Sequence, residues 1–174
     1  ERKAEAEQWF TADYDDTELS VVRLEEIQEG MAHIFGNKAV VLGRLIREGY
    51  QVPEGYALGR SVMYKFLASQ GCQVVEGTYQ PDMVEVARRV LTTNNATDFL
   101  RSLPLDAMVI FDEDGCSVRS SRLPGDVIGS ETASTLAVRS LEGLWKGIRK
   151  CWLNYLEQRV AVLKSGAQSD YIPL

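Results

Sequence analysis

The stretch GNKAVVLGRL, residues 36–45, opens the part of the chain that decides the fold. Apolar residues at helical spacing, with Gly49 behind them, predict a short helix over residues 38–48. Lys38 stands in the first turn of this helix, where unpaired N–H groups favour an anion and a lysine opposes the helix dipole. Gly36, just ahead of it, would let a ligand approach the main chain. Two interpretations follow: a solvated lysine, which is the commoner case, or a lysine that contacts a phosphate.

The rest of the chain predicts short strands and several helices in an irregular order. A long C-terminal helix over residues 141–164 carries one continuous apolar stripe, and Ser140 can cap its start. Because strands and helices do not alternate regularly, the α+β class is favoured over a doubly wound sheet. The other expected elements are strands over 19–24 and 134–140, an extended segment with a turn over 50–58, a hairpin over 107–121 around an Asp-Gly turn, a helix from Val62 that ends by Gly71, a helix that begins at Pro81, and a short helix with an Asn cap within 94–103.

Length and composition indicate a globular domain with one core. The chain has 174 residues, of which 45% are hydrophobic and 25% charged. A chain of this length can bury about 70% of its unfolded surface. The formal net charge of -6 argues against nucleic acid or an anionic membrane as a partner. No apolar stretch approaches the roughly 18 residues of a membrane-spanning helix.

The cysteines and the two ends of the chain predict its surroundings. Three cysteines at unrelated spacings and a single histidine, His33, favour reduced thiols in a cytoplasmic protein and no metal site. Residues 1–19 are acidic and polar, which predicts a linker or arm ahead of a folded part over 20–174. The chain begins with Glu1 and not with methionine, so we expect a piece of a longer polypeptide.

The segment SVRSS, residues 117–121, is the second candidate for phosphate chemistry. Alternation along a strand turns Val118 inward and places Arg119 on the opposite face, with two serine hydroxyls following. A guanidinium matches the geometry of phosphate oxygens with a rigid set of donors. Taken alone, the alternative of a surface arginine that leads into a polar loop is the commoner one.

Three segments, in this order, carry a resemblance to a known family. They read GNKAVVLGRLIREGYQVPEGYALGRSVMYKFL (36–67), SVRSS (117–121) and LAVRSLEGLWKGIRKCWLNYLEQRVAVL (136–163). The first resembles the opening, with its Gly-Gly-Lys, of the pyruvate phosphate dikinase and phosphoenolpyruvate synthase family. The second resembles that family's VRSSA segment, and the third resembles the helical stretch that follows it.

The resemblance implies an ATP-grasp fold, of which residues 20–174 would form the N-terminal subdomain. It implies that ATP lies between two subdomains and that phosphate passes to a histidine on a separate domain, and then to pyruvate or a related acceptor. By position, the family's ATP-phosphate lysine corresponds to Lys38, with Gly36 ahead of it, and its phosphate-contacting, charge-stabilising arginine corresponds to Arg119. Glu131 and Thr132 fall where the family has a glutamine-rich loop over the nucleotide. The acidic Mg²⁺ ligands, the second subdomain and the phosphohistidine domain would lie outside this chain.

The chain departs from the family pattern at three places. Asn37 replaces the second glycine, the ATAED that follows VRSS is missing, and GSETAST replaces the glutamine-rich loop. These departures motivate an alternative function, a degenerate ATP-grasp relative that works as a binding or regulatory module without catalysis. A structural interaction domain that shares only the α+β scaffold is a third hypothesis.

Overall fold

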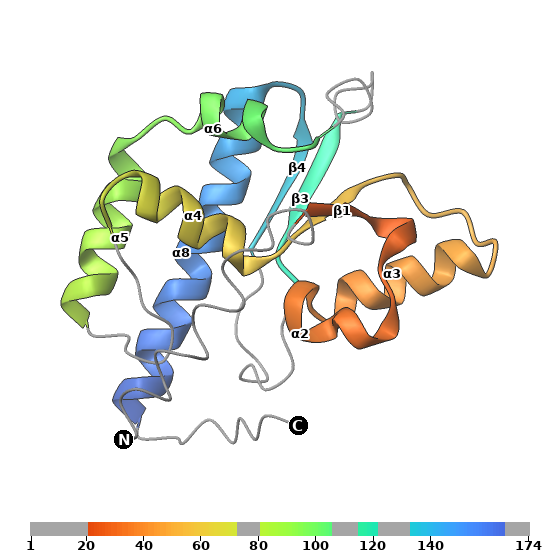
Figure 1. The fold of residues 1–174 in the computed structure, drawn as a ribbon, viewed down its shortest axis with the longest axis horizontal. Coiled ribbons are helices and arrows are strands. Elements are labelled where there is room, and N and C mark those ends of the chain that lie inside the picture. Colours follow the sequence, from red (N-terminus) through yellow and green to blue (C-terminus); the bar gives the residue numbers. More distant parts are fainter. Residues whose placement is uncertain (1–20, 73–80, 106–114, 122–132, 166–174) are drawn as a thin grey trace.

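The structure, a computed structural model, describes residues 21–72, 81–105, 115–121 and 133–165, and it is an α+β fold with two small antiparallel sheets (Figure 1). The longest element is the C-terminal helix, as the sequence predicts. In chain order the elements are β1 (Val21–Arg23), η2 (Leu24–Glu26), η3 (Glu29–Met31), α2 (Ala32–Phe35), α3 (Asn37–Arg47), β2 (Tyr56–Leu58), α4 (Arg60–Ser69), α5 (Pro81–Thr93), α6 (Thr97–Ser102), β3 (Cys116–Arg119), β4 (Ser134–Val138) and α8 (Leu141–Ser165).

Each sheet pairs two strands that are distant in the sequence. In the first, β1 pairs with β2, and Val22 lies opposite Ala57. In the second, β3 pairs with β4 in an antiparallel register that shifts between Cys116 and Val118. The expected strands over 19–24 and 134–140 are therefore confirmed within their limits. The first arm of the expected 107–121 hairpin lies outside the described residues.

The β1–β2 sheet separates two hydrophobic cores. Side chains alternate across a strand, so Val21 and Leu58 join the larger core, whereas Val22 and Ala57 join the smaller one. The smaller core is centred on Ile27, Phe35 and Ala39 from η2–α3. In Figure 1, α3 and the helices α4, α5 and α8 accordingly lie on opposite sides of β1.

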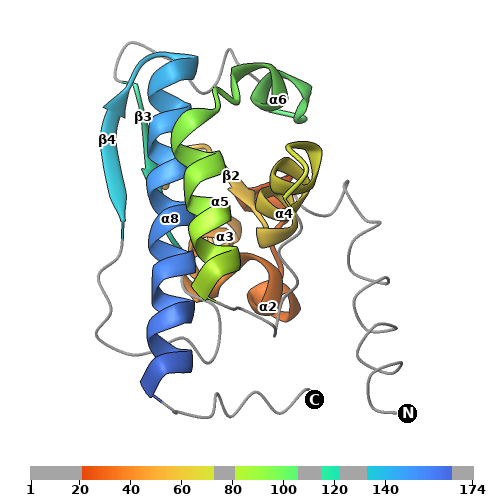
Figure 2. The ribbon, with the colours of Figure 1, turned by 90° about the vertical axis from the view of Figure 1, so that its left-hand side faces the viewer.

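The larger core is built on the apolar stripe of α8. Trp145 and Trp152 are both buried, and Phe66 of α4 packs between them and Phe99, with ring centroids 5.1, 6.1 and 5.3 Å away. Figure 2 shows α8 between the β3–β4 sheet on one side and α5 on the other. The stripe is therefore a core feature, because helices on one side and a sheet on the other both cover it.

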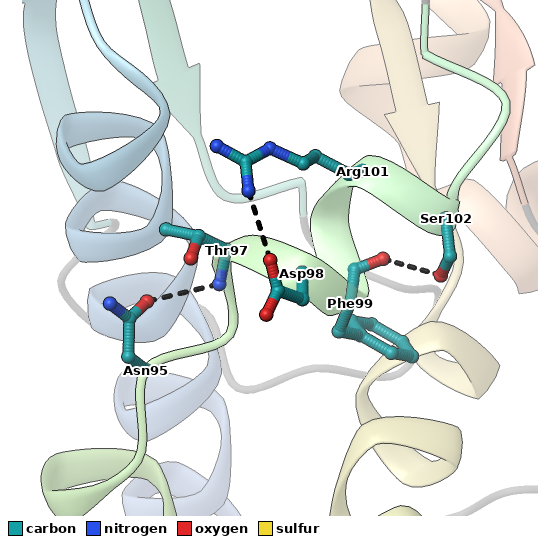
Figure 3. A network of polar contacts seen from close by, with 6 residues as sticks. All are labelled: Asn95, Thr97, Asp98, Phe99, Arg101 and Ser102. Atoms are coloured by element: carbon teal, nitrogen blue, oxygen red, sulfur yellow. Dashed lines mark hydrogen bonds and ion pairs between the residues drawn. The ribbon is translucent and has the colours of Figure 1, made fainter.

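The predicted start of α8 and the predicted ends of α3 and α4 agree with the structure. The Ser140 hydroxyl accepts the N–H of Gly143 at 3.1 Å at the start of α8. At α6 the expected Asn cap is wrong, because the N-cap residue is Ala96; the Asn95 side chain, one residue earlier, accepts the N–H of Thr97 at 3.0 Å (Figure 3). Gly49 and Gly71, which follow α3 and α4, have the positive φ angles of 85° and 74° that end a helix.

The smaller core holds α3 by a close approach of backbones. A Cβ on Gly43 would lie 2.5 Å from the carbonyl oxygen of Leu24 and 2.9 Å from that of Ile27. The Arg47 guanidinium donates to the carbonyls of Glu25 and Ile27 on the same side. Of the apolar positions that predicted the helix, only Ala39 is buried on this face, and Leu42, Leu45 and Ile46 stay partly exposed.

The three cysteines are free, as expected. Among the described residues there is no helix long and apolar enough to cross a membrane. The expected arm over 1–19 lies outside the described residues.

Candidate functional site

The N-terminus of α3 is shaped by Gly36. This residue is buried between α2 and α3 at a φ of 81° and a ψ of 161°, a conformation that glycine adopts and other residues avoid. It is also the N-cap residue of α3, so no side chain at this position can accept the first amides of the helix. Lys38 follows in the first turn with its side chain exposed.

The SVRSS segment is positioned by the packing of β3 against α8. Val118 is partly buried and packs against Gly147 of α8. The contact is close, because a Cβ atom added to Gly147 would lie 2.9 Å from the Cβ atom of Val118. Arg119 therefore faces the other way and is exposed, as alternation predicts. Ser120 and Ser121 then leave the strand and turn toward α3, where both make contacts.

The two candidate segments meet in space although they are 82 residues apart. The Lys38 ammonium donates to the Ser120 carbonyl at 3.5 Å, the outer limit of a hydrogen bond. The N–H of Ala39 donates to the Ser121 hydroxyl at 3.3 Å. The fold thus places the start of α3 against the end of β3, which periodicity and spacing do not predict.

Helix α8 adds a second lysine to this region, a residue that the sequence analysis missed. The Ser120 N–H donates to the Ala133 carbonyl at 3.0 Å, and the Lys150 ammonium donates to the next carbonyl, that of Ser134, at 3.3 Å. Lys38 and Lys150 therefore lie at the two ends of one short chain of contacts. The sequence signal that could have identified Lys150 is its position in GIRKCW, within the third family-like segment.

The pKa of Cys151, which follows Lys150 in the sequence, is affected by burial and by the charges of the two lysines. Its Sγ atom lies 3.8 Å from the Ala133 carbonyl oxygen. Burial raises the pKa of the Cys151 thiol to about 11, although the nearby charges of Lys150 and Lys38 act in the opposite direction. The thiol is therefore neutral at neutral pH, and the charges of both lysines act on it.

The region is cationic in the part of the chain that the structure describes. Within those residues no carboxylate lies within ion-pair distance of Lys38, Arg119 or Lys150, whereas Arg23, Arg44 and other cations have acidic partners. The same residues contain no group of three His, Cys, Asp or Glu side chains that could hold a metal. Amide, hydroxyl and ammonium donors suit an anion and not a cation.

The predicted site residues are brought together in part. Lys38 and the next residue, Ala39, contact the serines that follow Arg119, whereas the described contacts join neither Gly36 nor the Arg119 side chain to this pair. Glu131 and Thr132 lie outside the described residues, so their predicted place over a nucleotide stays a prediction. His33 is exposed on α2.

Comparison of the chain with models of protein families, with curated proteins and with solved structures gives no match.

Proposed function

We propose that this chain supplies the ATP-phosphate-binding half of an ATP-grasp phosphotransferase. In this proposal the enzyme moves phosphate from ATP to a carrier histidine on another domain, and from there to pyruvate or a related acceptor. The chain would act together with a second ATP-grasp subdomain and a phosphohistidine domain. Its own contribution would be to bind the phosphates of ATP.

The observation that carries the proposal is the contact between the first and second family-like segments. The Lys38 ammonium lies 3.5 Å from the Ser120 carbonyl oxygen, and the Ser121 hydroxyl accepts an amide of α3. Two segments selected for phosphate chemistry on independent sequence grounds therefore form one donor-rich region. The third segment adds Lys150 to the same region through Ser134.

The roles of the side chains follow from their charges. Lys38 would neutralise one phosphate and Arg119 would hold another through two parallel N–H donors, which stabilises the charge that develops during phosphoryl transfer. The Lys38 bond to a main-chain carbonyl at 3.5 Å is weak, so a phosphate can displace it. Mg²⁺ bound with ATP would shield negative charge on the phosphates, and in this proposal its acidic ligands come from the second ATP-grasp subdomain.

The test is Mg-ATP binding by wild type, Lys38→Ala and Arg119→Ala, measured by titration calorimetry. Loss of one charge-assisted hydrogen bond typically costs about 1.5–3 kcal/mol, so each variant should bind about 10–100-fold more weakly. Arg89→Ala is the matched control, because Arg89 is exposed on α5, on the other side of α8 from the β3–β4 sheet (Figure 2). Unchanged affinity in both site variants would refute the proposal.

A second candidate function is a phosphate-binding module without catalysis. It is favoured by the replacement of the second family glycine by Asn37 and by the contact that Lys38 already makes with a main-chain carbonyl. Transfer of labelled phosphate from ATP to protein, assayed in the complete polypeptide, separates the two. Binding that depends on Lys38 without any transfer would favour the module, whereas a labelled histidine would favour the enzyme.

A further inference from the structure

We infer that Ser121 is a positioning residue, which caps α3 from a distant part of the chain and thereby fixes Lys38 at the candidate phosphate site. The capping role rests on contacts within this chain. Its consequence for ATP rests on the proposed function.

Helix α3 receives no cap from the side chain of its own N-cap residue. An N-cap side chain normally accepts the N–H of the second or third helical residue, but the N-cap of α3 is Gly36, which has no side chain. Ala39 is the third helical residue, and its N–H donates to the Ser121 hydroxyl at 3.3 Å. The first bond within the helix runs from the Val40 N–H to the Gly36 carbonyl. Ser121 therefore does for α3 what its own N-cap residue cannot do.

The buried hydrophobic residues form two separate cores. Helix α3 belongs to the smaller core, whose buried members are Ile27, Phe35, Ala39 and Ala57, and none of these is a member of the larger core. The bonds of Lys38 and Ala39 to the serines after β3 join α3 directly to the sheet that packs on α8. Of these two, the Ser121 bond is the shorter and holds the backbone of α3 itself.

The Ser121 hydroxyl holds the backbone of α3 at the residue next to Lys38. The side chain of Ala39 is buried in the smaller core, and its N–H donates to the Ser121 hydroxyl. Side chain and backbone therefore both fix the position of this residue. Lys38 is the preceding residue, and its ammonium reaches the carbonyl of Ser120, the neighbour of the cap. Removing the Ser121 hydroxyl frees the first turn of α3 and so the starting point of the Lys38 side chain.

The experiment compares Ser121→Ala with Ser121→Thr, and uses Ser117→Ala as the matched control because Ser117 is exposed on β3. Amide hydrogen exchange of the intact chain is followed residue by residue without nucleotide, and Mg-ATP affinity is measured separately. Loss of an N-cap typically changes the local equilibrium about fivefold, so Ser121→Ala should speed exchange over Ala39–Leu42 about fivefold. Exchange in α4 and α8 should stay as in wild type. Ser121→Thr, which keeps the hydroxyl, should restore the protection, and Ser117→Ala should change nothing.

The affinity arm should show about fivefold weaker Mg-ATP binding for Ser121→Ala and recovery for Ser121→Thr. Unchanged exchange in Ser121→Ala overturns the inference, and so does equal acceleration in α3, α4 and α8, which would indicate a general loss of stability. A threonine variant that behaves like alanine also overturns it. If exchange responds as expected but wild type does not bind Mg-ATP, the proposed function fails while the capping role of Ser121 stands.

Discussion

The substitution Gly43→Ala tests how tightly α3 is packed against the preceding segment. The added methyl carbon would lie 2.5 Å from the Leu24 carbonyl oxygen and 2.9 Å from that of Ile27. An ordinary contact begins at 3.4 Å, so the first distance must grow by 3.4 − 2.5 = 0.9 Å. Because both neighbours are main-chain atoms, no side-chain rotation relieves the clash, and α3 must move away from η2.

Two opposing effects set the size of the change in stability. Alanine is a better helix former than glycine by about 1 kcal/mol, which favours the variant. Overpacking typically costs about 1–3 kcal/mol. Because backbone atoms cannot rotate away from the added methyl group, we expect a cost near the upper value, about 3 kcal/mol. The clash therefore wins, and the free energy of unfolding should fall by about 2 kcal/mol. For a domain of 150–250 residues this lowers the Tm by about 4–8 °C.

Urea denaturation and thermal unfolding, both followed by far-ultraviolet circular dichroism, measure this loss. Gly30→Ala is the matched control, since nothing lies within 4 Å of a Cβ at Gly30. The control should change the free energy of unfolding by no more than about 0.5 kcal/mol. A Gly43→Ala variant as stable as wild type, or more stable, would refute the close approach and with it the described position of Lys38.

Two further predictions concern the larger core and the thiol near the lysines. Phe66→Ala should lower the free energy of unfolding by about 3–5 kcal/mol, because Phe66 is 1% exposed and touches three aromatic rings. Urea denaturation followed by tryptophan fluorescence measures this change, and a loss below about 1 kcal/mol would contradict the prediction. Burial raises the pKa of Cys151 from 9.0 to about 11, so the folded state holds the thiol proton more tightly than the unfolded state. The resulting stability is present below pH 9.0 and is lost as pH rises toward about 11. Native Cys151 should react with iodoacetamide about 100-fold more slowly at pH 8 than a thiol of pKa 9.0, and an equal rate would contradict the burial.

The elements that local signals specify could be predicted from the sequence. The apolar stripe of α8 and the cap at Ser140 are contiguous in the chain, and both have the predicted place in the structure. Gly49 ends α3 for a local reason, since the residue after a helix often takes a left-handed conformation. Periodicity and turn chemistry act over a few residues, so they predict the boundaries of single elements.

The contacts that build the candidate site could not be predicted in this way. The bond from Ala39 to Ser121 joins residues 82 positions apart, and Lys150 reaches the site through the Ser134 carbonyl. Helix α3 also buries the face with Ala39 and Gly43, and not the larger Leu42 and Leu45, because a small residue lets the backbones approach. Such choices depend on the tertiary arrangement, which periodicity does not encode. The family resemblance implies one site for Lys38 and Arg119, and Lys150 lies within its third segment, but the resemblance does not indicate the cap at Ser121.

The central claim is that the start of α3 and the end of β3 form one phosphate-binding site. An amide chemical-shift titration of the 174-residue chain with Mg-ATP tests it most directly, since it detects weak binding and locates it. We expect the amide signals of Asn37, Lys38, Ser120 and Ser121 to shift together along one binding curve. In Lys38→Ala the Kd for Mg-ATP obtained from this curve should rise about 10–100-fold. Saturating Mg-ATP that leaves these four amides unmoved, or that moves a different region, would contradict it.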